Sequence, residues 1–179
     1  MAQAKLEQKI EKLAKKTRAA AQGMALIKTS VKDAALRTMA KAIVENKEYL
    51  QKENKKDIAF AKKAGLSSAL VDRLLLNEKR IAGMAQCLKD TIKIKDPVGE
   101  VMRTFKRPNG LLIKKVRTPI GVIGIIYESR PNVTSDCIGL CIKSGNAVIL
   151  KGGKEAYHSN KAIYKEIKEY EIDVSMTKI

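Results

Sequence analysis

Two aliphatic runs joined by one amphipathic helix constrain the fold of this chain more than any other feature. GVIGIIY, over Gly121–Tyr127, and NAVILK, over Asn146–Lys151, lack the polar–apolar alternation of a half-exposed strand. Strands of this kind are typical of a parallel sheet that is covered on both faces. Helical periodicity predicts a connecting helix over Val133–Lys143, which Gly145 ends, and a second helix over Tyr157–Tyr170. The predicted buried side of the connecting helix carries Val133, Cys137, Leu140, Cys141 and Ser144.

The two strands also predict where a ligand would bind. In an α/β sheet with right-handed crossovers, ligands lie beyond the carboxyl ends of the strands and next to helix N-termini. The loops at that edge are Glu128–Asn132 and Lys151–Lys154. Because these loops follow neighbouring strands, we expect them to face one ligand. Neither a GxGxxG nor a Walker motif occurs in the chain, so the pattern leaves the ligand open.

Each loop carries side chains that suit a binding site, and each also has an ordinary structural explanation. In Lys151–Lys154 (KGGK) the glycines allow close approach to a ligand and the lysines suit phosphate or ribose. Two adjacent glycines also form simple turns. In the other loop, Pro131 can fix the chain before the helix, and Asn132 suits either a helix cap or a catalytic amide. The residues alone leave both alternatives open.

Residues 1–95 are predicted to be helical and are rich in lysine. Ser30 can cap the second helix with Asp33 in the capping-box position, and the following helix is expected to end at Gly65. Asn77 can cap the last helix of the region. The predicted apolar face of the second helix carries Leu36, Met39, Ala40, Ile43 and Val44.

The character of the sequence changes after Asp96. VGEVMRTFKRPNGLLIKKV, over Val98–Val116, has two β-rich runs around the turn signal Pro108–Gly110, which predicts a β-hairpin. The 179 residues therefore divide into a helical region, this hairpin over residues 98–116, and a strand–helix–strand–helix unit over residues 119–170. A chain of this length is long enough to bury a core as one α/β domain.

A formal net charge of +17 is the unusual feature of the composition. Such a field attracts anions, and nucleic acid is one candidate. However, the lysines are dispersed through the helical stretches, and aromatic residues make up only 4% of the chain, without tryptophan. The chain therefore has few aromatic side chains on which bases could stack. A solvated basic surface, or a small ligand that carries phosphate, therefore fits better than a nucleic-acid-binding protein.

The cysteines and the single histidine fit structural roles. Cys137 and Cys141 lie four residues apart on one helical face without further ligands, which predicts core thiols and no metal site. We expect His158 at the surface or at a helix start, without the partners of a serine hydrolase. Unpaired cysteines, a charged N-terminus without a signal peptide and the lack of a membrane-length apolar run predict a reduced, cytoplasmic setting.

VRTPIGVIGIIYESRPNVTSD, followed by CIKSGNAVILKGGKEAYHSNKAI, resembles the γ-glutamyl phosphate reductase family of the aldehyde dehydrogenase superfamily. The resemblance is close over Val116–Ile163 and extends over most of residues 1–165. It implies part of an aldehyde-dehydrogenase-like domain and the reduction of L-glutamate 5-phosphate by NADPH, a step of proline synthesis that yields the semialdehyde and phosphate. It also implies that the hairpin resembles strands of an oligomerisation sheet, so a homo-oligomer is expected for the full-length family.

The resemblance assigns roles to both loops. Asn132 takes the position of the amide that stabilises the oxyanion, a large catalytic effect in such sites. Arg130 is expected to bind the substrate at its leaving phosphate. Lys154 stands where many NAD-preferring relatives have a glutamate, and its cation suits the 2′-phosphate of NADP. Lys151 takes the position of a lysine that binds the adenosine ribose. The implied cofactor-binding residues are Lys151, Gly152, Gly153 and Lys154.

The resemblance also implies what this chain does not supply. None of Cys87, Cys137 and Cys141 takes the position of the family's nucleophilic cysteine, and the final residues KEYEIDVSMTKI do not follow the family pattern. We therefore expect the N-terminal part of a longer enzyme, inactive alone. The alternatives are a nucleotide-binding remnant without catalysis and a basic nucleic-acid-binding protein.

Overall fold

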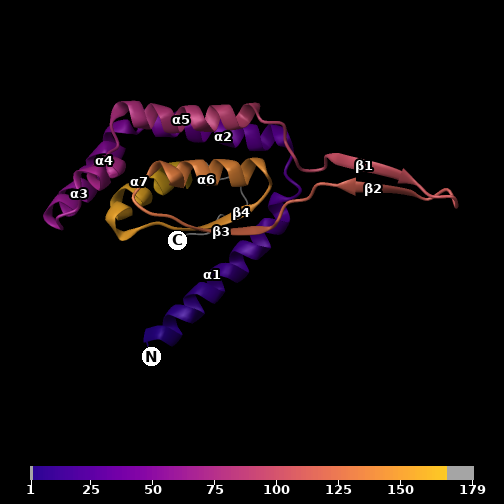
Figure 1. The fold of residues 1–179 in the computed structure, drawn as a ribbon, viewed down its shortest axis with the longest axis horizontal. Coiled ribbons are helices and arrows are strands. Elements are labelled where there is room, and N and C mark those ends of the chain that lie inside the picture. Colours follow the sequence, from indigo (N-terminus) through magenta and orange to yellow (C-terminus); the bar gives the residue numbers. More distant parts are fainter. Residues whose placement is uncertain (1, 169–179) are drawn as a thin grey trace.

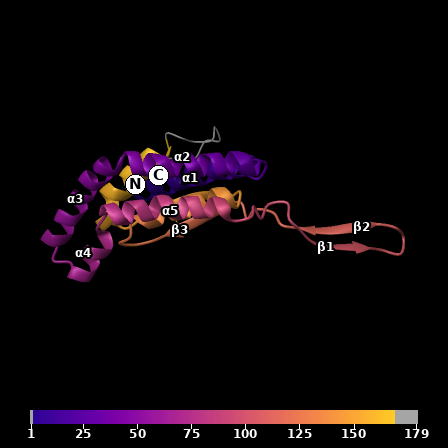
Figure 2. The same ribbon diagram turned by 90° about the horizontal axis from the view of Figure 1, so that it is seen from above.

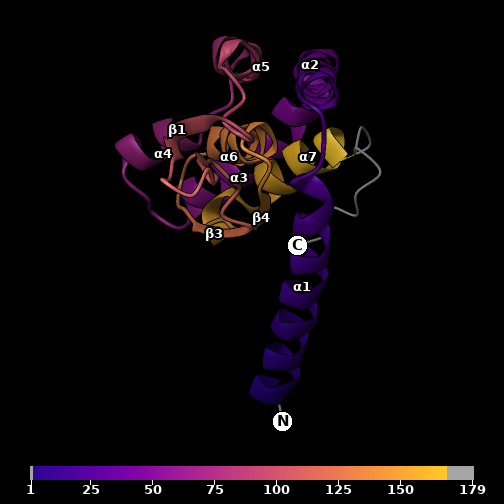
Figure 3. The same ribbon diagram turned by 90° about the vertical axis from the view of Figure 1, so that its right-hand side faces the viewer.

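The computed structural model describes residues 2–168 of the chain. Figure 1 shows a body of helices and strands from which a β-hairpin projects, and Figure 2 shows the same projection from above. The long first helix leaves the body in another direction (Figure 3). In order, the elements are α1 (Ala2–Met24), α2 (Thr29–Glu45), α3 (Lys47–Lys63), α4 (Ser68–Leu74), α5 (Glu78–Lys93), β1 (Val101–Lys106), β2 (Leu112–Val116), β3 (Val122–Ile126), α6 (Asn132–Lys143), β4 (Ala147–Lys151), η1 (Lys154–Ala156) and α7 (Tyr157–Lys168).

The predicted strand–helix–strand–helix unit is present. β3 pairs in parallel with β4, from Val122 opposite Ala147 to Ile126 opposite Lys151. α6 packs against β4 from one side and α1 from the other (Figure 1). The expected cover on both faces is less complete for β3, where the side chain of Ile126 is 80% exposed. The last two residues of the predicted final helix lie outside the described residues.

The prediction for the buried side of α6 is confirmed at Cys141 and wrong at Leu140, while Val133, Cys137 and Ser144 are partly buried. Leu140 is 51% exposed, whereas Thr134, Ile138 and Ile142 are buried. The reason is that α6 lies between α5 and β4, so its buried surface turns towards Gly139 instead of following the predicted stripe. A Cβ atom at Gly139 would lie 2.5 Å from Leu88 Cδ2, so the glycine lets α5 and α6 approach closely.

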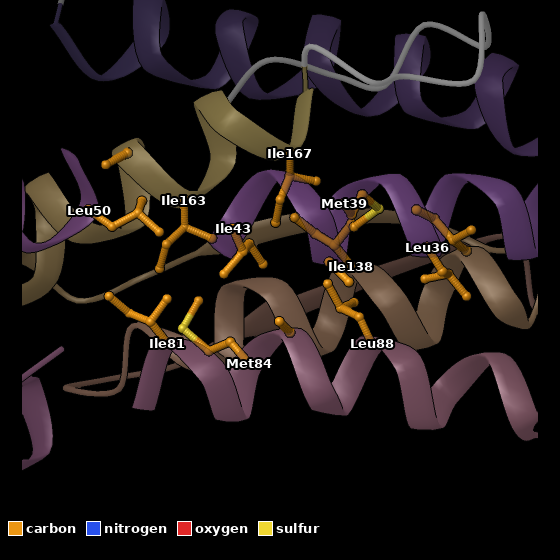
Figure 4. Packing of buried hydrophobic residues seen from close by; sticks show 14 of the residues in the cluster. Leu36, Met39, Ile43, Leu50, Ile81, Met84, Leu88, Ile138, Ile163 and Ile167 are labelled. Atoms are coloured by element: carbon orange, nitrogen blue, oxygen red, sulfur yellow. The ribbon is translucent and has the colours of Figure 1, made fainter. Parts of the chain in front are cut away.

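α2, α5, α6 and α7 enclose the main apolar core (Figure 4). Val44 is 46% exposed, so its predicted place on the buried face of α2 is wrong, because the buried stripe passes through Ile43. The other four predicted residues of that face are buried. Members of the core include Leu36, Met39, Ile43, Leu50, Ile81, Met84, Leu88, Ile138, Ile163 and Ile167.

Within residues 1–95, the predicted helix ends at Gly65 and Asn77 are confirmed, and the predicted cap at Ser30 is wrong. Gly65 follows α3 with φ +70°, and the Asn77 side chain accepts a hydrogen bond from the Arg80 backbone N–H, as a cap should. Ser30, however, lies inside α2, which begins at Thr29 without a side-chain cap. Asp33 forms no capping box because it pairs with Lys143 Nζ at 2.6 Å.

Two lysines are buried beneath the apolar surface of α2 and α6. The side chain of Lys32 is 0% exposed, and its Nζ lies 2.9 Å from Asp96 Oδ2. Lys143 Nζ, which pairs with Asp33, also donates to the Ile92 carbonyl at 2.9 Å. Buried ammonium groups are tolerated only when they are paired and hydrogen-bonded. These pairs therefore fasten α2 to α6 and to the segment that leads into the hairpin.

The predicted hairpin is confirmed. β1 and β2 pair antiparallel, with Lys106 opposite Leu112 nearest the turn, and Gly110 takes φ +85° in that turn. Every residue of both strands is exposed. Asp96 holds the base of the hairpin, since its carboxylate accepts hydrogen bonds from Lys32, Thr29 and the Val98 backbone N–H.

Protonation of Asp96 is expected to weaken the fold in acid. Burial raises the pKa of Asp96, but the hydrogen bonds from Lys32, Val98 and Thr29 outweigh it and hold that pKa below its ordinary value. Because the folded pKa lies below the unfolded value of about 3.9, the stabilisation is present above that pH and is lost as the pH falls through the folded pKa. Urea midpoints of wild type and Asp96→Asn should differ at neutral pH, and the difference should begin to shrink below about pH 4 and vanish below the folded pKa. A constant difference across this range would contradict the assignment.

Candidate active site

The two predicted loops lie side by side at the carboxyl edge of the parallel sheet. The Tyr127 backbone N–H donates to the Lys151 carbonyl at 3.1 Å, which joins the strands where the loops begin. We call Glu128–Asn132 the ESRPN corner and Lys151–Lys154 the KGGK loop. Beyond the strands, the Ser129 backbone N–H donates to Glu155 Oε1 at 2.7 Å, just after the KGGK loop.

Asn132 does not cap α6. It is the first residue of that helix, Pro131 occupies the cap position, and no side-chain cap bond is present. Instead, Asn132 Nδ2 donates to Asp136 Oδ2 at 2.9 Å, one helical turn further on. A carboxylate only accepts hydrogen bonds, so Asp136 fixes the NH₂ end of the amide and leaves the second N–H for another acceptor.

Asn132 and Arg130 line a cleft between the start of α6 and the helices α4 and α5. Arg80, on its α5 wall, donates to the Leu75 carbonyl and to Asp72 Oδ2 at 2.9 and 2.8 Å, which holds the two helices together. We call this the arginine cleft. Its polar lining consists of Asp72, Arg73, Arg80, Cys87, Arg130, Asn132 and Asp136.

Cys87 is the cysteine that lines the arginine cleft, yet its environment disfavours a thiolate. Burial, then the charge of Asp136 and a hydrogen bond to it, raise the pKa of Cys87 to about 11. A thiol becomes an effective nucleophile only as the thiolate, which a pKa this high suppresses at neutral pH. Burial likewise raises the pKa of Cys137, and that of Cys141 to about 11. Cys141 is buried in the core and Cys137 packs against it, which fits their predicted structural role.

The KGGK loop opens onto a second cleft, not onto the arginine cleft. Lys151, Gly152 and Gly153 line it together with one face of α7. Among its lining residues none is acidic, and four are lysines. We call it the lysine cleft, with Tyr127, Tyr157, Tyr164, Lys151, Lys161, Lys165 and Lys168 as its aromatic and cationic residues.

We expected both loops to face one ligand, but the structure places them at two different clefts. Tyr127 and Thr134 line the lysine cleft, while Asn132 lines the arginine cleft, so the ESRPN corner and the start of α6 separate two neighbouring clefts. Lys154, at the start of η1, is exposed and is not among the described lining residues of either cleft. Sequence reasoning missed the α7 lysines, although Lys161, Lys165 and Lys168 recur at helical spacing.

The glycines of the KGGK loop lie against side chains of their protein neighbours. A Cβ atom at Gly152 would collide with Asn160 Nδ2 and lie 3.2 Å from Tyr127 Oη. At Gly153, a Cβ atom would collide with the carboxylate of Glu155. Close approach of the loop to a ligand stays a prediction, and a side chain at either position would displace Asn160 or Glu155.

His158 stands at the start of α7, as predicted, but it does have a carboxylate neighbour. Its Nδ1 lies 3.8 Å from Glu53 Oε2, and its backbone N–H donates to Asp57 Oδ1 at 3.0 Å. Asp57 also accepts from the backbone N–H and hydroxyl of Ser159, so it caps α7 from α3. Residues 2–168 contain no group of three or more potential metal ligands, and no helix among them is long and apolar enough to cross a membrane.

Comparison with known proteins decides the family. The sequence model described as "Aldehyde dehydrogenase family" matches residues 1–178, which is nearly the whole chain. The chain belongs to the aldehyde dehydrogenase family. Its α/β fold agrees with this, since solved relatives superpose on most of it.

Several similar proteins within the aldehyde dehydrogenase family carry the name gamma-glutamyl phosphate reductase. The gamma-glutamyl phosphate reductase of Carboxydothermus hydrogenoformans is 54% identical over 157 residues, which are 88% of this chain and 38% of that protein. The crystal structure of the Thermotoga maritima gamma-glutamyl phosphate reductase has a TM-score of 0.88 at 42% identity, over 93% of this chain and 40% of that one. That of Saccharomyces cerevisiae has a TM-score of 0.85 at 35% identity, over 89% and 40%. The chain thus spans about two fifths of these relatives.

Aldehyde dehydrogenases use a nicotinamide cofactor, and the lysine cleft has the chemistry to hold one. Its lysines supply cations for phosphate, and its tyrosines supply flat apolar surface. The residues present therefore fit a nicotinamide dinucleotide.

Proposed function

We propose that this chain forms the N-terminal part of an NADPH-dependent γ-glutamyl phosphate reductase, which converts L-glutamate 5-phosphate to L-glutamate 5-semialdehyde and phosphate in the cytoplasm. The observation that carries the proposal is the Asn132 amide at the arginine cleft, with one N–H held by Asp136 and the other without a hydrogen-bond partner among residues 2–168. The shared name of the relatives supports the substrate.

Asn132 is proposed to donate its free N–H to the carbonyl oxygen of the acyl phosphate. A thiolate from the remainder of the enzyme attacks the carbonyl carbon, negative charge develops on that oxygen, and phosphate leaves as the thioester forms. A donor fixed in advance stabilises this charge without reorganisation. Arg130, exposed at the mouth of the cleft, is proposed to contact the departing phosphate. The raised pKa values of the thiols of Cys87, Cys137 and Cys141 argue that none of them is the attacking group.

The lysine cleft is proposed to bind NADPH, which supplies the hydride that reduces the thioester to the aldehyde and releases the thiol. Lys151 is proposed to bind the adenosine ribose, next to Gly152 and Gly153. Lys154 is proposed to approach the 2′-phosphate, since it is exposed and follows Gly153 directly in the chain. A nucleic-acid-binding role finds no support in the comparisons, which return reductases.

The proposal is tested in a chimera that joins this chain to the part of the Carboxydothermus hydrogenoformans relative that it does not match. The chimera should oxidise NADPH in the presence of L-glutamate 5-phosphate. Lys154→Glu should lower kcat/KM for NADPH roughly tenfold, equivalent to about 1.4 kcal/mol, because it sets a carboxylate against the 2′-phosphate. NADH carries no such phosphate and should be affected less.

Lys89→Glu is the matched control, because it makes the same charge reversal on the exposed face of α5. It should leave the preference between NADPH and NADH unchanged. A folded chimera that does not consume either cofactor would refute the reductase proposal. Equal loss of activity with NADPH and NADH in Lys154→Glu would refute the assignment of that lysine alone.

A further inference from the structure

We propose that Glu155 is a positioning residue that ties the ESRPN corner to the KGGK loop, so that the place of Asn132 depends on the state of the lysine cleft. Glu155 lines neither cleft among the described lining residues, and it lies on η1, immediately after the KGGK loop. The coupling to cofactor binding rests on the proposed function. The hydrogen bonds between Glu155 and Ser129 are observed independently of that function.

The first observation is a pair of hydrogen bonds across the two loops. Glu155 Oε1 accepts from the Ser129 backbone N–H at 2.7 Å and from its hydroxyl at 3.1 Å. Hydrogen bonds to an ionised carboxylate are among the stronger ones in proteins. Burial raises the pKa of Glu155, but hydrogen bonds to its own backbone N–H and to Ser129, with the charge of Lys151, hold that pKa below its ordinary value. The carboxylate therefore stays ionised and accepting at neutral pH.

The second observation is the backbone of Ser129. Among the described residues, Ser129 is the one residue other than glycine that has a positive φ, at +50°. An L-residue adopts this conformation only where its surroundings hold it, and Ser129 lies three residues before Asn132. The bonds to Glu155 supply such a hold, because they bind both the amide and the hydroxyl of Ser129.

The third observation is the space left for Glu155. A Cβ atom at Gly153 would lie 2.5 Å from Glu155 Cδ. Gly153 has φ −68°, which any residue adopts, so the conformation of its backbone does not explain the glycine. A side chain at position 153 would displace the carboxylate of Glu155 from its place beside Ser129.

A second chain of hydrogen bonds joins the residue after β3 to the first turn of α6 and to α7. Tyr127 Oη lies 2.6 Å from Thr134 Oγ1, which donates to Asn160 Oδ1 at 3.1 Å. The other end of the Asn160 amide lies against Gly152. The Glu155 bonds thus tie the ESRPN corner to the residue after the KGGK loop, and the second chain ties the first turn of α6 to Asn160, which lies against Gly152. A ligand that moves the KGGK loop also shifts the strained corner.

Amide hydrogen exchange, followed by NMR on the full 179-residue chain, tests the tie without any ligand. In Glu155→Ala the Ser129 amide should exchange roughly 10- to 100-fold faster, since it loses a charge-assisted hydrogen bond. Glu155→Gln should recover most of the protection, because its amide oxygen still accepts from Ser129. Gly153→Ala should reproduce part of the loss by displacing the carboxylate.

Glu45→Ala, which removes an exposed glutamate from α2, is the control and should leave Ser129 exchange unchanged. Unchanged exchange in Glu155→Ala would overturn the proposal, as would failure of Glu155→Gln to restore protection. Addition of NADPH should then slow Ser129 exchange in wild type and not in Glu155→Ala. If the KGGK loop does not respond to NADPH at all, the proposed cofactor site fails, while the ligand-free comparison still decides the role of Glu155.

Discussion

Replacing Lys32 with alanine is expected to lower the free energy of unfolding by about 3–5 kcal/mol, the loss that follows removal of one partner from a buried ion pair. Lys32 Nζ lies 2.9 Å from Asp96 Oδ2, and the two side chains are 0% and 11% exposed. Without the ammonium, the Asp96 carboxylate keeps a desolvated charge, and the emptied space adds a cavity. Urea unfolding at neutral pH, followed by circular dichroism, measures the change.

Two further variants separate the ion pair from the packing. Lys32→Met keeps much of the volume, so it should destabilise mainly through the unpaired Asp96, and adding Asp96→Asn should recover part of the loss. Lys41→Met removes an exposed lysine that lies 3.6 Å from Glu45 and should cost less than about 1 kcal/mol. Additive effects of Lys32→Met and Asp96→Asn would show that the two side chains are not coupled.

Asn132→Ala in the chimera is expected to lower kcat roughly 100- to 1,000-fold, which is the usual cost of removing one oxyanion donor. The expected change in KM is small, because the amide acts on charge that develops only in the transition state. Asn132→Asp should lose at least as much, since it keeps the size of the side chain, removes both N–H donors and adds a charge beside Asp136. Initial rates of NADPH oxidation at saturating substrate measure both variants.

Asn46→Ala is the control for this series. Asn46 lies between α2 and α3, where its Nδ2 donates to the Ala42 carbonyl at 3.0 Å, and it lines neither the arginine nor the lysine cleft. Its loss should leave kcat within about twofold of the unmodified chimera. If Asn132→Ala matches this control, the amide is not the oxyanion donor, and the arginine cleft needs another role.

The strands, the hairpin and most helix ends could be predicted because their signals are local. An apolar run, the turn at Pro108–Gly110 or the cap at Asn77 each depends on residues a few positions apart. The pairing of Asn132 with Asp136 had a local signal too, since the two stand one helical turn apart, but a cap was the commoner reading.

The rest of the site depends on contacts between distant segments. Lys32 and Lys143 are buried because Asp96 and Asp33 reach them from 64 and 110 positions away. Gly153 lies against the Glu155 carboxylate. A hydrogen bond from Ser129, 26 positions earlier in the chain, holds that carboxylate in place. No periodicity encodes such distances. Two clefts replaced the one that was expected because α6 starts between the loops, with its first turn facing both.

The exposed hairpin also separates two kinds of evolutionary constraint along this chain. Every residue of β1 and β2 is exposed, so substitutions there leave the body of the protein intact, and selection on them comes from whatever surface covers the hairpin. Asp96, a few residues before β1, is bound to Lys32 inside the body and cannot change alone. Variation along residues 96–116 should therefore rise sharply past Asp96. The hairpin can acquire new contacts over evolutionary time while its anchor stays the same.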